Sequence, residues 1–145
     1  YNISLQTLNG IASHNGELEC EEYQPRPLES FAEFDRMMER CYVDPSYVQS
    51  LMPCTLEGAV VRISDIIAYL GKDRQDAERA GVEVSYKGTD NAYMINNFVV
   101  NIVENSFGKD YIKMDEYYFE ALKKAKRDKN CPFKLIFAEK VRFFP

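Results

Sequence analysis

One stretch of the sequence, GAVVRISDIIAYLGKDRQDAERAG at residues 58–81, places three chemically capable side chains at four-residue intervals: Asp65, Tyr69 and Asp73. An aspartate held on a helix can give a hard oxygen ligand to a divalent metal. A tyrosine one turn later can offer its ring to a sugar, and the next aspartate can accept a hydrogen bond from a sugar hydroxyl. Spacing alone leaves a second interpretation open, in which this Asp-Tyr-Asp line is simply the solvent-exposed face of an amphipathic helix.

The helix that carries this line is expected to begin after Thr55, a good N-cap, and to end at Gly81. At about 100° per residue, its apolar side chains form one core-facing stripe. The stripe consists of Leu56, Ala59, Val60, Ile63, Ile66, Ile67 and Leu70. The Asp-Tyr-Asp line is expected roughly opposite the stripe, on an exposed face with Arg62 and Asp76, where Arg62 can pair with Asp65.

The remaining pattern predicts an all-α fold, a helical bundle formed by one domain over residues 1–145. Further helices are expected at 2–13 with Asn2 as cap, 28–43, 89–107 with Thr89 or Asp90 as cap and Gly108 as stop, and 114–130. Residues 15–27 are expected to form a surface loop and residues 82–87 a brief extended piece. The tail after Pro132 suits a short strand or a helix.

Composition narrows the classes of function. A net charge of −5 argues against a chain that coats nucleic acid, and LKKAKRDK at 122–129 is more typical of a solvated helix end than of a single-stranded nucleic acid site. Four dispersed cysteines and one histidine, His14, make a structural zinc site an unfavourable interpretation. No apolar run is long enough for a membrane span, so we expect a cytoplasmic protein. Both chain ends look cut from a longer protein.

Three segments carry a family resemblance. Residues 58–81 resemble the last metal-binding helix of the dGTP triphosphohydrolase-like branch of the HD-domain phosphohydrolases, whose typical wording is VVRIADEIAYxxHDIDDAIRAG. NISLQTLNGIASHNGE, from residue 2, resembles LNLTLQTLDGILxHNGE in that family. MDEYYFEALKKAK, from residue 114, is similar to MSEEVFEALxxLK. The resemblance therefore spans most of the chain and identifies it as a fragment of an HD-domain fold.

The resemblance implies a function and roles for the three side chains. Family members are α-helical, bind a divalent metal such as Mg²⁺ or Mn²⁺, and hydrolyse a deoxynucleoside triphosphate to a deoxynucleoside and triphosphate. Carried over by position, Asp65 would be the final metal ligand. Tyr69 would pack on the deoxyribose, and Asp73 would bind the 3′-hydroxyl. The resemblance also implies a homo-oligomer.

Departures from the family pattern limit this inference. The family's earlier His and His-Asp metal ligands have no counterpart in the chain, because His14, its one histidine, matches a helix end where it would contact the terminal carbonyls. Lys72 stands where the family commonly has histidine. We therefore expect no catalytic residue in this chain and no activity of the chain alone. The alternative is a degenerate HD-type helical domain that acts as an interaction or regulatory module.

Overall fold

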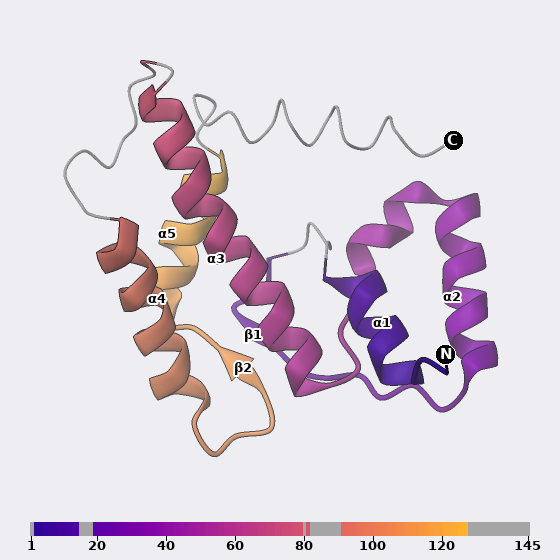
Figure 1. The fold of residues 1–145 in the computed structure, drawn as a ribbon. Helices are drawn as coiled ribbons and strands as arrows, with labels where there is room; N and C mark the ends of the chain where they lie inside the picture. The colour runs from indigo at the N-terminus through magenta and orange to yellow at the C-terminus, as the bar shows by residue number, and fades with distance from the viewer. Residues whose placement is uncertain (1, 15–18, 80, 82–90, 128–145) are drawn as a thin grey trace.

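The computed structural model describes residues 2–14, 19–79, 81 and 91–127, without the side chains of residues 71–78, 91 and 125–127. The predicted all-α class is confirmed, since this part of the chain is mostly helical. The long central helix is α3 (Leu56–Arg79), which α1 (Leu5–Ser13) and α4 (Asn91–Ser106) both contact. Figure 1 shows α1 and α2 (Phe31–Val43) toward one end of the molecule, and α4 and α5 (Glu116–Arg127) toward the other.

The first two helices start later than the sequence suggests. Ser4 caps α1, because its Oγ accepts from the Thr7 N–H at 3.2 Å, so the expected Asn2 cap is wrong. Ser30 caps α2 in the same way by accepting from the Glu33 N–H at 3.3 Å, which excludes residues 28–30 from the helix. In each case the cap is the residue whose oxygen reaches the free N–H three positions on.

Three helix limits were predicted correctly. Thr55 caps α3, with its Oγ1 3.1 Å from the Gly58 nitrogen. Gly81, after α3, and Gly108, after α4, have φ of +72° and +71°, a left-handed conformation that favours glycine at a helix end. The expected cap at Thr89 or Asp90 lies outside the described residues, as do the expected extended piece at 82–87 and the tail after Pro132.

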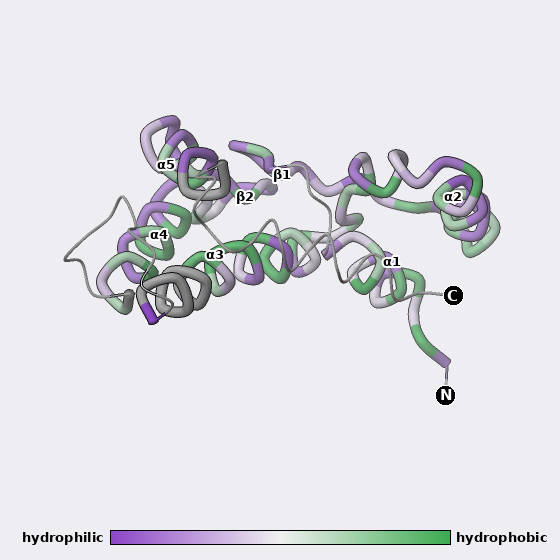
Figure 2. The backbone as a smooth tube through the Cα atoms, turned by 90° about the horizontal axis from the view of Figure 1, so that it is seen from above, coloured by the Kyte–Doolittle hydropathy of each residue, from purple (hydrophilic) through white to green (hydrophobic). Residues whose placement is uncertain are grey.

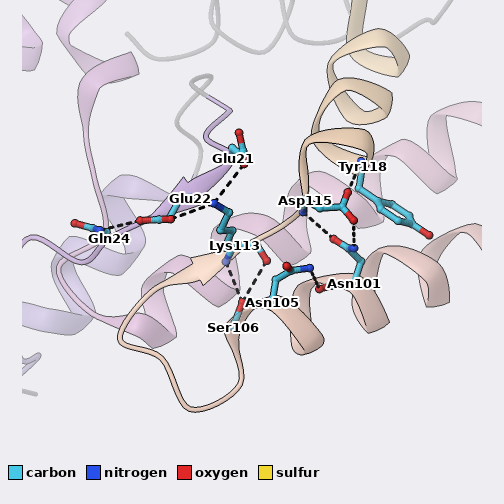
Figure 3. Close-up of polar contacts among 9 residues, drawn as sticks. All are labelled: Glu21, Glu22, Gln24, Asn101, Asn105, Ser106, Lys113, Asp115 and Tyr118. Atoms are coloured by element: carbon cyan, nitrogen blue, oxygen red, sulfur yellow. Dashed lines mark hydrogen bonds and ion pairs between the residues drawn. The ribbon is translucent and has the colours of Figure 1, made fainter.

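A two-stranded sheet replaces part of the expected loop at 15–27. Strand β1 (Glu22–Tyr23) pairs antiparallel with β2 (Ile112–Lys113), with Glu22 opposite Lys113. The Lys113 ammonium lies 3.5 Å from the Glu22 carboxylate and 3.4 Å from that of Glu21, as Figure 3 shows. No local period reveals such a strand, because its partner lies far along the chain. This pairing brings the loop before α2 against the segment between α4 and α5.

The core lies between α3, α4, α5 and the sheet. Its buried members are Tyr23, Ala59, Ile63, Ile67, Leu70, Phe98, Met114 and Leu122. The predicted stripe of α3 is thus confirmed at four positions, whereas Val60 is 46% exposed and does not belong to it. None of the described helices is both long and apolar enough to cross a membrane.

Candidate functional site

All three residues of the Asp-Tyr-Asp line belong to α3. Asp65 is half-buried and Tyr69 is 37% exposed, and the residue that precedes each of them, Ser64 and Ala68, is exposed. The structure therefore keeps Asp65 and Tyr69 one helical turn apart and accessible from the same side. Asp73 belongs to α3 one turn further on, but its side chain lies outside the described part, as does that of Lys72.

Arg62 contradicts the sequence expectation. It was expected on the exposed face beside Asp65, yet it is fully buried at 0% exposure. Its Nη1 donates to the carbonyl oxygens of Leu51 at 2.6 Å and Ser13 at 3.2 Å. Its guanidinium carbon also lies 5.6 Å from the centre of the Tyr23 ring, within the range of a cation–π contact. Arg62 therefore holds α3 to the end of α1 and to the segment before α3.

The helical wheel explains this placement. Residue 62 lies about 40° from residue 66 and about 60° from residue 59, so it borders the core stripe. Arginine has five donors on a planar group, which lets it satisfy two buried carbonyls at once. Placing Arg62 with the Asp-Tyr-Asp line on the exposed face was the error. Asp65 follows Arg62 by three residues on the same helix, so this buried anchor holds the part of α3 that carries Asp65.

A buried asparagine completes the anchor. Asn9 in α1 is 1% exposed, and its Oδ1 accepts from the Cys54 N–H at 2.7 Å while its Nδ2 donates to the Met52 carbonyl at 3.3 Å. Both partners belong to the segment that leads into α3. The only signal in the sequence is one amide among the apolar positions of a short helix, and the sequence reasoning missed it. Together Asn9 and Arg62 fix where α3 begins.

A groove of about 640 Å³ runs between α1 and α3. Gly10, Ile11 and His14 line one wall, and Gly58 and Val61 line the other. The helices approach closely there, since a Cβ added to Gly58 would lie 3.8 Å from the Gly10 Cα. Asp65 follows Val61 by one turn of α3. The lining of the groove on α3 thus ends at Val61, one turn before the Asp-Tyr-Asp line.

His14 has the structural role that the sequence indicated. It is the C-cap of α1, and its Nδ1 lies 2.6 Å from the Ile11 carbonyl oxygen. This contact engages one ring nitrogen with the end of its own helix. The interpretation of His14 as a helix-terminal histidine is confirmed.

The described residues supply too few ligands for a metal ion. No group of three or more histidine, cysteine, aspartate or glutamate side chains among them could hold one. Asp65 alone offers a single carboxylate, whereas Mg²⁺ and Mn²⁺ need about six ligands, several of which can be water. Any metal at Asp65 would need further ligands from outside the described part of the protein.

The basic run at 122–129 is described only in part. The Lys123 ammonium lies 2.6 Å from the Glu120 carboxylate and over the Phe119 ring at 4.7 Å. Its charge is therefore partly offset within α5. This arrangement fits the interpretation of a solvated helix end.

Comparison with known proteins gives one informative similarity. A deoxyguanosinetriphosphate triphosphohydrolase-like protein of Caldanaerobacter subterraneus subsp. tengcongensis is 36% identical to this chain over 78 residues. The match covers 48% of this chain but only 23% of the relative's length. No protein-family model matches the chain, and no solved structure matches it. About half of this chain thus resembles part of a triphosphohydrolase-like protein.

Proposed function

We propose that this chain is part of a metal-dependent deoxynucleoside triphosphate triphosphohydrolase. In the reaction, water attacks the α-phosphorus, the bond between that phosphorus and the 5′-oxygen breaks, and a deoxynucleoside and triphosphate are released. The observation that carries this proposal is the 36% identity to the triphosphohydrolase-like relative. The accessible side of α3 with Asp65 and Tyr69 agrees with it.

Each member of the Asp-Tyr-Asp line has one task in this proposal. Asp65 gives one oxygen ligand to the divalent cation, which supplies electrostatic stabilisation of the phosphate charge when bound. The Tyr69 ring packs against the deoxyribose and crowds a 2′-hydroxyl. Asp73 accepts a hydrogen bond from the 3′-hydroxyl. The rigidity of α3 matters because a displacement of about 1 Å in a positioning group can cost about 100-fold in rate.

The chain alone is expected to be inactive. One carboxylate does not retain a divalent cation, and His14 directs one ring nitrogen to its own helix end. The remaining ligands would come from other parts of the complete protein. Normal triphosphohydrolase activity of the isolated 145-residue chain with Mg²⁺ or Mn²⁺ would contradict this.

The decisive experiment uses the complete protein that contains this chain. Deoxynucleoside and ribonucleoside triphosphates are supplied one at a time with Mg²⁺ or Mn²⁺, and triphosphate release is measured. We expect deoxynucleotides to be preferred, and Asp65→Asn to lower kcat/KM by about 100-fold or more because a metal ligand loses its charge. Asp35→Asn, an exposed carboxylate on α2, is the matched control and should act like the wild type.

Two results would count against the proposal. Normal activity of Asp65→Asn would remove the metal-ligand role. Absence of hydrolysis by the wild-type complete protein with every nucleotide and both metals would favour the degenerate HD-type helical domain, an interaction or regulatory module without catalysis.

A further inference from the structure

The exposed side of α3 beside the candidate site carries no charge. Across residues 58–68, the exposed residues are Val60, Val61, Ser64 and Ala68. The opposite side of the same helix carries the core stripe. Figure 2 shows α1 and α3 along one edge of the molecule, with α2, α5 and the sheet on the other side of them. A helix without charge on its outer side as well as its core side is typical of one that has a further partner.

The groove between α1 and α3 extends this uncharged surface. Ile11 and Val61, which are 58% and 54% exposed, line its two walls. A Cβ added to Gly10 would meet no neighbouring atom of the described residues within 4 Å, so no contact in this part of the chain requires glycine there. Glycine inside a helix is destabilising relative to alanine, but it lets another segment approach the backbone closely. The α1 wall of the groove therefore has room for a closely packed helix.

Asp65 lies on the same side of α3 as the groove. At about 100° per residue, Asp65 falls between Gly58 and Val61 around the helix axis, and Tyr69 lies about 20° beyond Gly58. Four residues separate Val61 from Asp65, which is a rise of about 6 Å along the axis. A helix that occupied the groove and continued along α3 for one or two turns would therefore reach Asp65 and Tyr69.

We propose that this surface binds a helix from the part of the complete protein outside residues 1–145, and that the bound helix brings missing metal ligands to Asp65. We call the surface the α1–α3 face; it consists of Gly10, Ile11, Val61, Ser64 and Ala68. The bound helix would place apolar side chains against the valine and isoleucine of the face. Its histidine or carboxylate side chains would lie at the end next to Asp65, since these groups bind divalent cations.

The shortage of ligands at Asp65 identifies the partner, so this inference rests on the proposed function. A second copy of the chain would add only the same described residues, which contain no group of three or more ligands for a metal ion. The triphosphohydrolase-like relative, in contrast, has about three quarters of its length outside the match. A segment of the same polypeptide also binds at a high effective concentration. The rest of the complete protein can therefore supply both the helix and the ligands.

Thiol protection in the complete protein tests whether the α1–α3 face is covered. Ser64→Cys is a small change at an exposed position of this chain, and mass spectrometry measures how fast iodoacetamide alkylates residue 64. We expect alkylation at least tenfold slower in the native protein than in urea. Ala32→Cys, at an exposed position on α2, is the matched control and should react at similar rates in both. Equal native and unfolded rates for residue 64 would overturn the proposal.

Photo-cross-linking identifies what covers the face. A benzophenone side chain is placed at residue 61 of the complete protein, and the products are separated on a denaturing gel and mapped by mass spectrometry. We expect cross-links within one chain, from residue 61 to a segment outside residues 1–145. A product with the mass of two chains would assign the face to a second copy and overturn the proposed partner.

Metal affinity tests whether the bound helix supplies ligands. Val61→Gln introduces an uncharged amide that would lose its water partners on docking, so we expect Mn²⁺ binding to the complete protein to weaken about tenfold. Because no charge is added, the change reports docking rather than direct repulsion of the cation. Val103→Gln on α4 is the matched control, since both valines are 54% exposed, and should bind Mn²⁺ like the wild type. Equal affinities of the two variants would contradict the ligand-supplying helix.

The outcomes separate this inference from the proposed function. Protection of residue 64 in a protein that hydrolyses no nucleotide would support the α1–α3 face as a docking surface and contradict the proposed function. Hydrolysis by a protein in which residue 64 is unprotected would support the function and overturn the docking surface. Circular dichroism checks that each variant folds.

Discussion

Asn9 and Asn101 perform the same task in the two ends of the molecule. Each is a buried amide on one helix that holds the start of a later helix. Asn9, 1% exposed, binds backbone groups of Met52 and Cys54 before α3. Asn101, 8% exposed, accepts from the Asp115 N–H at 3.0 Å and donates to the Asp115 carboxylate at 2.6 Å (Figure 3).

The two sites differ in the hydrogen bonds that remain when the asparagine side chain is removed. The Asp115 carboxylate also caps α5, because it accepts from the Tyr118 N–H at 2.9 Å, so it retains a partner if Asn101 is lost. The Cys54 N–H belongs to a buried residue and depends on Asn9. Arg62 reinforces only the α3 start. The start of α3, the helix that carries Asp65 and Tyr69, is therefore held more tightly than the start of α5.

The largest expected effect on stability comes from replacing Arg62, which reinforces the start of α3. Arg62→Met keeps much of the side-chain volume but leaves the Ser13 and Leu51 carbonyls without this donor, so we expect a loss of about 3 kcal/mol or more in the free energy of unfolding. Arg62→Lys keeps the charge but lacks the planar fork, and should lose less. Urea unfolding followed by circular dichroism measures both. A loss below about 1 kcal/mol for Arg62→Met would show that this anchor does not hold α3.

The two asparagines test the comparison directly. Asn9→Ala should lower the free energy of unfolding by about 2 kcal/mol, because a buried N–H loses its acceptor. Asn101→Ala should cost about 1 kcal/mol, because the Asp115 N–H that loses its acceptor belongs to a half-buried residue and the Asp115 carboxylate keeps its capping bond. Asn96→Ala, at an exposed amide on α4, is the control and should change stability by less than about 0.5 kcal/mol. Equal losses for Asn9→Ala and Asn101→Ala would remove the proposed difference.

The smallest effect concerns alkaline pH. Burial raises the pKa of the Tyr23 phenol, more than the Cys20 N–H and the Arg62 charge lower it. The folded protein therefore favours the neutral phenol, whose stabilising contribution is intact below the unfolded value of about 10 and is lost as pH rises through the folded pKa. Tyr23→Phe should lose stability less steeply between about pH 9.5 and 11. Urea unfolding across that range measures the slope, Tyr117→Phe at an exposed position should match the wild type, and parallel slopes for wild type and Tyr23→Phe would contradict the prediction.

The sequence predicted those parts of the fold whose signals are local. Thr55, Gly81 and Gly108 act within a few residues of themselves, so the limits of α3 and the end of α4 could be predicted from them. Strand β1 and the burial of Arg62 depend on partners elsewhere in the chain, which no period shows.

The candidate site divides in the same way. The four-residue spacing was enough to place Asp65 and Tyr69 on one side of α3, and the structure agrees with this. What the spacing could not supply was the anchor beneath them, since Asn9 was missed and Arg62 was assigned to solvent. Their roles toward a metal and a sugar stay predictions.

The short β1–β2 pair has a consequence for how the chain folds. It joins residue 22 to residue 113, so its closure is entropically costly and comes only after most of the chain has emerged. Helices α1 and α3 can associate through contacts that do not involve β2. Tyr23, in contrast, becomes fully buried only when Met114 and its neighbours pack against it. During synthesis, part of the core would thus stay exposed after the early helices have formed. The rate of the last folding step would depend on the long sequence separation between β1 and β2 rather than on helix formation.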